Sequence, residues 1–239
     1  INNIVAEILD KKDKNIDDIQ SDKQLVSEIL NETAERIVYL LRINQVNDAF
    51  IILDTGSLYG GEGTQEAGGF YVRDANISVD GINDNDDLLL EAGSSTVAME
   101  LDISLDFEWE SRIGVGKNEN GDFDFYHNTL SIARENPHLS HLYFGNWSDF
   151  SSISPSALPS MKYTIPLISD DDVVYGVIGV GLLEKSILTQ MQSGDFEYEK
   201  SCYILASKFD KKAMATLSFL PVKQKGETLY LAIAENSNK

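Results

Sequence analysis

The sequence predicts an α+β protein, in which a long N-terminal helical segment precedes an antiparallel sheet with helices inserted between its strands. Three observations indicate this. The chain from Ile1 to Phe50 has helical periodicity and contains neither Pro nor Gly. From Ala49 onward, short apolar runs bounded by turn residues are typical of strands. The helical segments do not alternate regularly with those runs, so repeated βαβ units are not expected.

The N-terminal segment predicts two helical pieces or one long helix with a weak middle. Ser21 or Asp22 is expected to cap the second piece, "SDKQLVSEILNETAERIVYLLRINQ". An earlier apolar stripe is separated from it by the charged stretch "DKKDKNIDD". The apolar residues of the second piece recur at the i, i+3, i+4, i+7 spacing of an amphipathic helix: Leu25, Val26, Ile29, Leu30, Ala34, Ile37, Val38 and Leu41.

The remaining elements follow in chain order. Helices are expected in "FYHNTLSIARENPH", which Pro137 stops, and in "EKSILTQMQ". The run of Leu88, Leu89 and Leu90 before Gly93 indicates a further short helix. Strands are expected in "AFIILDTG", "FYVRDANISVDG", "HLYFGNW", "MKYTIPLI", "VVYGVIGVGL", "SCYILASK", "ATLSFLPV" and "TLYLAIAE".

The composition excludes several classes of partner. The chain of 239 residues carries 39 Asp and Glu against 19 Lys and Arg, a formal net charge of −20. Such a surface repels nucleic acid and anionic lipid headgroups, so no nucleic-acid partner is expected. The single cysteine, Cys202, permits no disulfide within the chain and no Cys/His zinc site. No apolar run approaches the roughly 20 residues that cross a bilayer.

No arrangement of residues predicts catalysis or metal binding, and no cofactor is expected. The histidines His127, His138 and His141 do not stand at a metal-binding spacing with a carboxylate partner. Phosphate-binding, dinucleotide-binding and hydrolase motifs are absent from the sequence. The loop from Asp80 to Glu91 has the length of a calcium loop, but its third position is apolar and its central glycine is replaced, so we interpret it as a solvated acidic loop.

Aromatic and charged residues gather in the middle of the chain, a composition typical of a small-molecule pocket. In such a pocket Asp106 would accept hydrogen bonds from cationic or hydroxyl donors. Arg73 would pair with an anion or with Asp106, and the aromatic residues would form the walls. The alternative, that these are core aromatics and surface ion pairs, stays open. The residues expected to line the pocket are Arg73, Asp106, Trp109, Tyr126, Trp147, Ser148 and Tyr163.

An ordered series of segments resembles the double-Cache (dCache) extracytoplasmic sensor domains of bacterial receptors, above all those of transmembrane diguanylate cyclases and sensor histidine kinases. The likeness extends from about Ala49 to Met191. The segments that carry it are "FYVRDANISVDGINDNDDLLLEAG", "LDISLDFEW", "FYHNTLSIARENP", "FGNWSDF" and "YTIPLISDDDVVYGVIGVGLLEKSIL".

The resemblance implies a long helix at 1–47, a membrane-distal PAS-like ligand-binding subdomain at 48–195, and the start of a smaller membrane-proximal sheet subdomain at 196–239. It also implies membrane anchors outside this sequence, dimerisation through the N-terminal helix, and an extracytoplasmic location at the cell membrane. The chain starts without an initiator Met, as a piece of a longer protein would.

In one position this chain differs from part of the family that it resembles. Amino-acid-binding members have an Asp near the end of the last distal strand, where this chain has Gly181, so amino-acid binding is not implied. Glycines in that strand remove side chains from its surface. Gly176 and Gly179 are expected to point to opposite faces. Gly179 and Gly181 are then expected to let another element, or a ligand, approach the backbone closely.

The leading hypothesis is a noncatalytic small-molecule sensor that passes ligand occupancy through the long helix to a cytoplasmic kinase or cyclase domain. A second hypothesis is a hydrolase or lyase that uses the paired carboxylates Asp106 and Glu108, which share a strand face. A third is a domain without a small ligand that works through protein contacts along the N-terminal helix.

Overall fold

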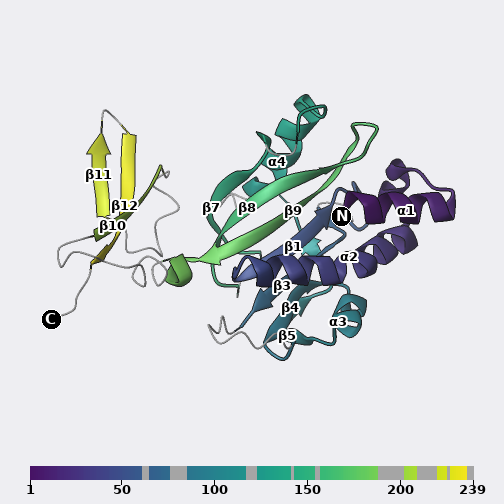
Figure 1. The fold of residues 1–239 in the computed structure, drawn as a ribbon, viewed down its shortest axis with the longest axis horizontal. Helices are drawn as coiled ribbons and strands as arrows, with labels where there is room; N and C mark the ends of the chain where they lie inside the picture. The colour runs from purple at the N-terminus through teal and green to yellow at the C-terminus, as the bar shows by residue number, and fades with distance from the viewer. Residues whose placement is uncertain are drawn as a thin grey trace. The chain divides into compact units, whose positions relative to one another are not determined.

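The computed structural model describes residues 1–60, 65–75, 85–116, 123–140, 143–153, 157–187, 202–208, 220–224 and 227–235. Contacts divide the chain into two compact units, Ile1–Leu182 and Leu183–Lys239, and each is described by itself. The first unit therefore contains both the N-terminal helices and the large sheet (Figure 1).

The N-terminal segment forms two α-helices, as predicted, with a short 3₁₀ helix between them. Asp22 caps the second α-helix, because its carboxylate accepts hydrogen bonds from the backbone N–H groups of Gln24 and Leu25 at 2.9 and 3.0 Å. The amphipathic stripe of that helix is buried, as its periodicity predicted. The three elements are α1 (Asn2–Lys12), η1 (Ile16–Gln20) and α2 (Lys23–Ile43).

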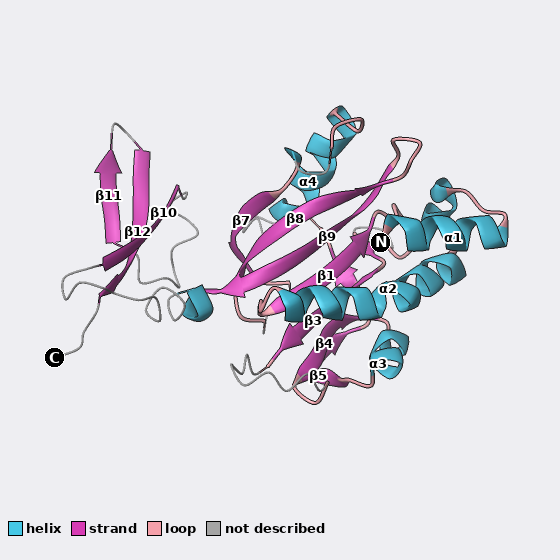
Figure 2. Cartoon of the chain, viewed as in Figure 1, coloured by secondary structure: helices cyan, strands magenta, loops and turns pink. Residues whose placement is uncertain are grey.

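A seven-stranded sheet forms the centre of the first unit, in the order β5-β4-β3-β1-β9-β8-β7 (Figure 2). The α+β class is as predicted, but the sheet is mixed, because β4 and β5 run parallel. Its strands are β1 (Asp48–Leu53), β3 (Gly69–Asp74), β4 (Leu88–Gly93), β5 (Ser104–Glu110), β7 (Asn146–Ser151), β8 (Ser160–Ile168) and β9 (Val174–Leu183). A separate small ladder pairs β2 (Glu66–Ala67) with β6 (Ile113–Gly114).

Two sequence predictions in this unit are wrong. The leucine run 88–90 is part of strand β4 and not a helix, because Leu88 and Leu90 pair with β3 and are buried. Gly93, at φ +120°, ends the strand, and Ser94 caps the helix α3 (Ser95–Leu101) that follows. The strand expected in "HLYFGNW" begins only at Asn146.

Helices cover the two faces of the sheet unequally. Helices α1, α2 and α3 pack on the face that carries Ala49, Ile51 and Leu53. Helix α4 (Asp124–Glu135) packs on the other face, which carries Phe50 and Ile52, and it ends just before Pro137 as predicted (Figure 1). We call these the α2 face and the α4 face.

The second unit contains a three-stranded antiparallel sheet in the order β10-β12-β11. Its strands are β10 (Cys202–Lys208), β11 (Leu220–Gln224) and β12 (Glu227–Glu235), at or close to the positions expected from the sequence. The helix expected in "EKSILTQMQ" is present over residues 184–187, and the rest of that segment lies outside the described residues.

Candidate ligand-binding site

Strand β8 buries polar side chains on the α4 face, the reverse of the usual strand pattern. Ser160, Lys162 and Thr164 are 0%, 0% and 1% exposed. The Thr164 hydroxyl lies 2.8 Å from the hydroxyl of Thr129 on α4, which fixes the face to which these residues point. Tyr163, between them, points to the other face and is only half-buried. Polar side chains are rarely buried in a protein core, so buried ones call for a specific explanation.

Lys162 brings a positive charge into this core. Its Nζ donates to the carbonyl and hydroxyl oxygens of Ser151 on β7, the latter at 3.2 Å. It also donates to the carbonyl and hydroxyl oxygens of Ser160, at 3.1 and 3.2 Å. Phe125 on α4 has its ring centroid 5.4 Å from Nζ. The ammonium is thus matched by oxygen acceptors, which a buried charge requires.

Asp48, at the start of β1, brings a negative charge to the same place. Its side chain is buried, and its Oδ1 has no hydrogen-bond partner among the described residues. Close by, the Tyr71 hydroxyl lies 3.2 Å from the Ser160 hydroxyl. We call Asp48, Tyr71, Ser151, Ser160 and Lys162 the Asp48–Lys162 cluster. A buried acceptor without a donor is uncommon in folded proteins.

The glycines of β9 make room for this cluster and for its neighbours. Asp48 pairs with Gly181 in the sheet register, and a Cβ built on Gly181 would stand 2.5 Å from the Asp48 carboxylate carbon. A Cβ built on Gly179 would stand 2.6 Å from the Tyr163 carbonyl oxygen and closer still to Cζ of the Phe50 ring. The expected close approach to Gly179 and Gly181 is therefore present, and neighbouring strands supply the approaching groups.

Arg73 on β3 joins a second group of charges on the α4 face. Arg73 pairs with Asp48 in the register of β1 and β3, so the two side chains share that face. Its guanidinium donates to the carboxylate of Glu91 on β4 and, at 2.9 Å, to Oδ2 of Asp106 on β5. Glu91 is buried. We call Arg73, Glu91 and Asp106 the Arg73 network.

Aromatic rings border the Asp48–Lys162 cluster. Phe50 stacks on Tyr71 with a centroid distance of 5.4 Å and an interplanar angle of 7°. Phe50 also meets Phe125 of α4 edge-on at 5.3 Å. The α4 face therefore places charged groups beside aromatic rings, the kinds of side chain that line small-molecule sites.

Burial has the largest effect on the pKa values of the acidic groups Asp48 and Glu91. Burial raises the pKa of Asp48 above its usual value, and the Lys162 ammonium opposes the rise only in part. Burial likewise raises the pKa of Glu91 against the opposing effect of Arg73. Burial also raises the pKa of the Tyr71 hydroxyl, so it stays protonated and can donate a hydrogen bond.

The residues predicted from the sequence fall into separate groups. The structure brings Arg73 and Asp106 together, but it packs Trp109 against the hydrophobic cluster of the α2 face, with the indole Nε1 donating to the Gly93 carbonyl at 3.0 Å. Tyr126, on α4, is buried in the core of the α4 face, where burial raises its pKa.

The other three predicted residues lie on β7 and β8. Trp147 pairs with Tyr163 in register, their ring centroids are 5.2 Å apart, and Trp147 is 45% exposed. Tyr163 alternates with Lys162, so this aromatic pair lies on the opposite face from the Asp48–Lys162 cluster. Ser148 accepts a hydrogen bond from the backbone N–H of Lys162 at 3.0 Å and contributes to strand pairing.

Sequence reasoning missed Asp48 and Lys162. One signal was present, since Ser160, Lys162 and Thr164 alternate with apolar residues in "SMKYTIPLI". Such alternation normally places the polar residues in solvent, so it did not distinguish this strand from an ordinary one. Only the position of α4 over the polar side of β8 identifies that side as buried.

The other candidates from the sequence do not form a site in the described residues. The ring of His127 bonds the Val115 carbonyl at 2.7 Å, and His138 is exposed, while His141 lies outside the described residues. Most of the loop between Asp80 and Glu91 also lies outside them, and Glu91 itself pairs with Arg73. In the part of the chain that the structure describes, no three His, Cys, Asp or Glu side chains could hold a metal ion.

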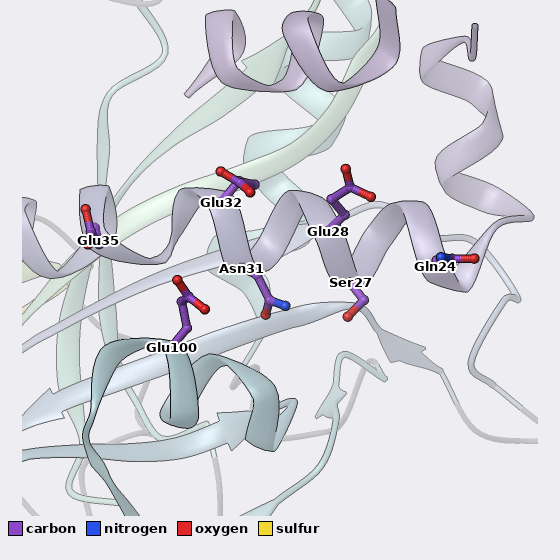
Figure 3. A pocket seen from close by; sticks show the side chains of 7 residues that line it. All are labelled: Gln24, Ser27, Glu28, Asn31, Glu32, Glu35 and Glu100. Atoms are coloured by element: carbon purple, nitrogen blue, oxygen red, sulfur yellow. The ribbon is translucent and has the colours of Figure 1, made fainter. Parts of the chain in front are cut away.

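An open groove of about 510 Å³ runs along the outer side of α2 beside α3 (Figure 3). Glu28 in this groove forms an ion pair with Lys12 of α1 at 2.6 Å. Its lining is polar and strongly acidic, and it consists of Gln24, Ser27, Glu28, Asn31, Glu32, Glu35 and Glu100. We interpret it as a solvated face of the helix.

Comparison with protein-family models and with curated proteins found no match to this chain.

Proposed function

We propose that this chain is the extracytoplasmic small-molecule-sensing domain of a transmembrane receptor, of the double-Cache type, and that its ligand binds at the Asp48–Lys162 cluster. The domain itself is noncatalytic in this proposal, and it passes ligand occupancy to a cytoplasmic output domain such as a kinase or a diguanylate cyclase. The observation that carries the proposal is the reversed pattern of β8, which buries Ser160, Lys162 and Thr164 beneath α4.

The energetic cost of this cluster supports a functional role. Replacing a buried ion pair by apolar residues of similar size is often neutral or stabilises a protein by about 1–4 kcal/mol. Asp48 and Lys162 are 2% and 0% exposed, and Lys162 acts electrostatically on Asp48, so the same argument applies to these two buried charges. A carboxylate that lacks a donor for Oδ1 adds to that cost.

The position of Asp48 supports signalling through α2. Helix α2 ends at Ile43, and β1 begins at Asp48, so a short connection joins the helix to the cluster. Within that connection, the Asn47 N–H donates to the Gly181 carbonyl at 3.0 Å, and the Asn47 carbonyl accepts from the Asp74 N–H at 2.8 Å. A ligand that moves Asp48 would therefore act directly on the end of α2, and its differential affinity for two helix positions would shift their populations.

The two other hypotheses have less support. Asp106 pairs with Arg73, and Glu108 stands in solvent, so these carboxylates do not form the coupled acid–base pair that a hydrolase or lyase needs. The apolar stripe of α2 packs against its own sheet, while the groove on its outer side is acidic. A second copy that met this acidic side would bring like charges together, so dimerisation through the helix would require another part of α1 or α2.

The membrane location belongs to the same proposal. Among the described residues, no helix has both the length and the apolar composition that crossing a bilayer requires. The membrane anchors of the receptor would lie outside the sequence given.

Thermal unfolding with a library of metabolites tests the proposal, because a ligand that binds only the folded state raises Tm. We expect at least one metabolite to stabilise the wild type. The Asp48→Asn variant should lose this response, while Asp171→Asn, which removes an exposed carboxylate in the β8–β9 turn, should keep it. No response from any metabolite, or an equal response in Asp48→Asn, would contradict the proposal.

A further inference from the structure

We infer that the ligand of this site carries a protonated amine, whose N–H group donates to Oδ1 of Asp48, and that the ligand has no carboxylate. This inference depends on the proposed function, because it assigns the chemical class of the ligand at the Asp48–Lys162 cluster. The two cations Lys162 and Arg73 already have acceptors, whereas one carboxylate oxygen, Oδ1 of Asp48, has no donor among the described residues.

Lys162 and Arg73, the cations of the Asp48–Lys162 cluster and the Arg73 network, already bond to acceptors. Lys162 Nζ is surrounded by the carbonyl and hydroxyl oxygens of Ser151 and Ser160. The Arg73 guanidinium bonds Glu91 and Asp106. A ligand carboxylate or phosphate would have to displace these partners to gain a cation, and it would leave buried oxygens without donors.

In the described part of the chain, the buried side-chain atom of this face without a partner is an acceptor. Asp48 Oδ1 is buried without a hydrogen-bond partner among the described residues, and in the ionised carboxylate only a donor can complete it. The position of this carboxylate is restricted, because it occupies the space in which a side chain on Gly181 would stand. The carboxylate is therefore held against β9 with one oxygen unsatisfied.

The charge balance favours a cationic donor over a neutral one. The Asp48–Lys162 cluster and the Arg73 network together contain three carboxylates, Asp48, Glu91 and Asp106, and two cations, Lys162 and Arg73. With all five groups ionised, the sum is one negative charge. A hydrogen bond between an ammonium and a carboxylate is roughly twice as strong as one between neutral groups.

The aromatic border suits the rest of such a ligand. The ring of Tyr71, a member of the cluster, stacks on Phe50, and Phe50 meets Phe125 edge-on. Phe125 already lies 5.4 Å from the Lys162 ammonium, a distance at which a ring attracts a cation. An alkyl or aryl ammonium therefore fits the chemistry of this border, whereas a zwitterionic amino acid would lack a free cation for its carboxylate.

Sets of isosteric probes test the inference by thermal unfolding of the wild type. Each set compares an amine with the alcohol and the carboxylate of similar size at one ionic strength, for example butylammonium, butanol and butyrate, and the sets range from methylammonium to phenethylammonium. We expect at least one ammonium ion to raise Tm by about 2–4 °C and its alcohol and carboxylate to have no effect.

The Asp48→Asn variant removes the charge at nearly constant shape and should weaken binding of that ammonium ion at least about 10-fold. Asp171→Asn is the matched control and should bind it as the wild type does. The wild-type comparison of isosteres stands even if Asp48→Asn does not fold. The inference is overturned if no ammonium ion stabilises the wild type, if an alcohol or carboxylate does so equally, or if Asp48→Asn binds unchanged.

These outcomes separate the inference from the proposed function. A neutral or anionic metabolite that stabilises the wild type, and needs Asp48 to do so, would refute the amine while leaving the sensor proposal in place. A metabolite library without any ligand would refute both.

Discussion

The carboxylate of Asp48 lies directly against the backbone of Gly181 on the neighbouring strand, so closely that a Cβ on Gly181 would stand 2.5 Å from the carboxylate carbon. This relationship explains a glycine in a strand interior, where a larger side chain is normally favoured. It also fixes the orientation of a buried charge at the junction between α2 and the sheet.

Replacement of Gly181 by Ala tests this relationship. The new methyl group must displace the Asp48 carboxylate from a buried site, and overpacking of a core typically costs about 1–3 kcal/mol. Urea unfolding should show a loss of this size. Gly114→Ala is the matched control, because nothing lies within 4 Å of a Cβ built there, and it should leave stability nearly unchanged.

A double variant distinguishes this contact from a general effect on the strand. In the Asp48→Ala background the carboxylate is gone, so Gly181→Ala should cost much less than it does in the wild type. Equal costs in the two backgrounds would show that the Asp48 carboxylate does not occupy the space above Gly181.

Replacement of Lys162 by Met should be among the most destabilising changes in the chain. It removes the cation that most strongly favours the charged form of Asp48 and leaves oxygens of Ser151 and Ser160 without this donor, and breaking such a buried charged arrangement costs about 3–5 kcal/mol. Chemical unfolding measures the loss, and Lys11→Met, at an exposed lysine of α1, is the control. Adding Asp48→Asn to Lys162→Met should recover much of the loss; a Lys162→Met protein as stable as the control would contradict a charged, buried Lys162.

The pKa of Asp48 gives a prediction with a definite sign. Because the pKa is raised in the folded protein, the folded state holds this proton to a higher pH than the unfolded state, whose Asp pKa is about 4. Stability from this group is therefore present below about pH 4 and is lost as the pH rises through the folded pKa.

Unfolding between pH 4 and pH 8 measures this effect. The free energy of unfolding of the wild type should fall relative to that of Asp48→Asn as the pH rises, by about 1.4 kcal/mol for each unit of the pKa shift. The wild type should also lose stability relative to Glu91→Gln as the pH rises, because the Glu91 pKa is raised as well. A wild type that gains stability relative to Asp48→Asn with rising pH would refute the raised pKa.

Removal of Arg73 tests whether the Arg73 network holds β3, β4 and β5 together. Arg73→Met leaves the buried Glu91 without its cation, and we expect a loss of about 1–3 kcal/mol, less than for a fully buried pair because the Arg73 side chain is 23% exposed. Arg134→Met is the matched control. Arg134 pairs with Asp54 but is 53% exposed, so its loss should stay below about 1 kcal/mol. Equal losses would show that the network contributes no more than a surface pair.

Trp147→Ala distinguishes two locations for the ligand. Trp147 lies with Tyr163 on the face opposite the Asp48–Lys162 cluster, so a ligand at the cluster should still raise Tm in this variant. If the variant folds and loses the response while Asp48→Asn keeps it, the aromatic pair on β7 and β8 would be the site.

Much of the fold was predictable, because it depends on local patterns. The periodicity of α2 and the Asp22 cap were correct, since helix periodicity and capping are properties of neighbouring residues. The strand at Leu88–Leu90 and the parallel β4–β5 pair were missed, because a short apolar run has no distinctive period and strand pairing is set by distant residues.

The candidate site was harder to predict for the same reason. Arg73 and Asp106 could be identified as polar residues near aromatic ones, and they do meet. Whether Lys162 faces solvent or the core depends on which side of β8 carries α4, and no residue near Lys162 in the sequence contains that information. Likewise, only the register of β1 with β9 shows that Asp48 lies over Gly181.

The measurement that tests the central claim most directly is a crystal structure of the protein with the metabolite that stabilises it most. The account predicts ligand density on the α4 face, with a ligand nitrogen about 2.7–3.2 Å from Asp48 Oδ1. Ligand density in the α2 groove or beside Trp147, with Asp48 Oδ1 bonded only to water, would contradict it.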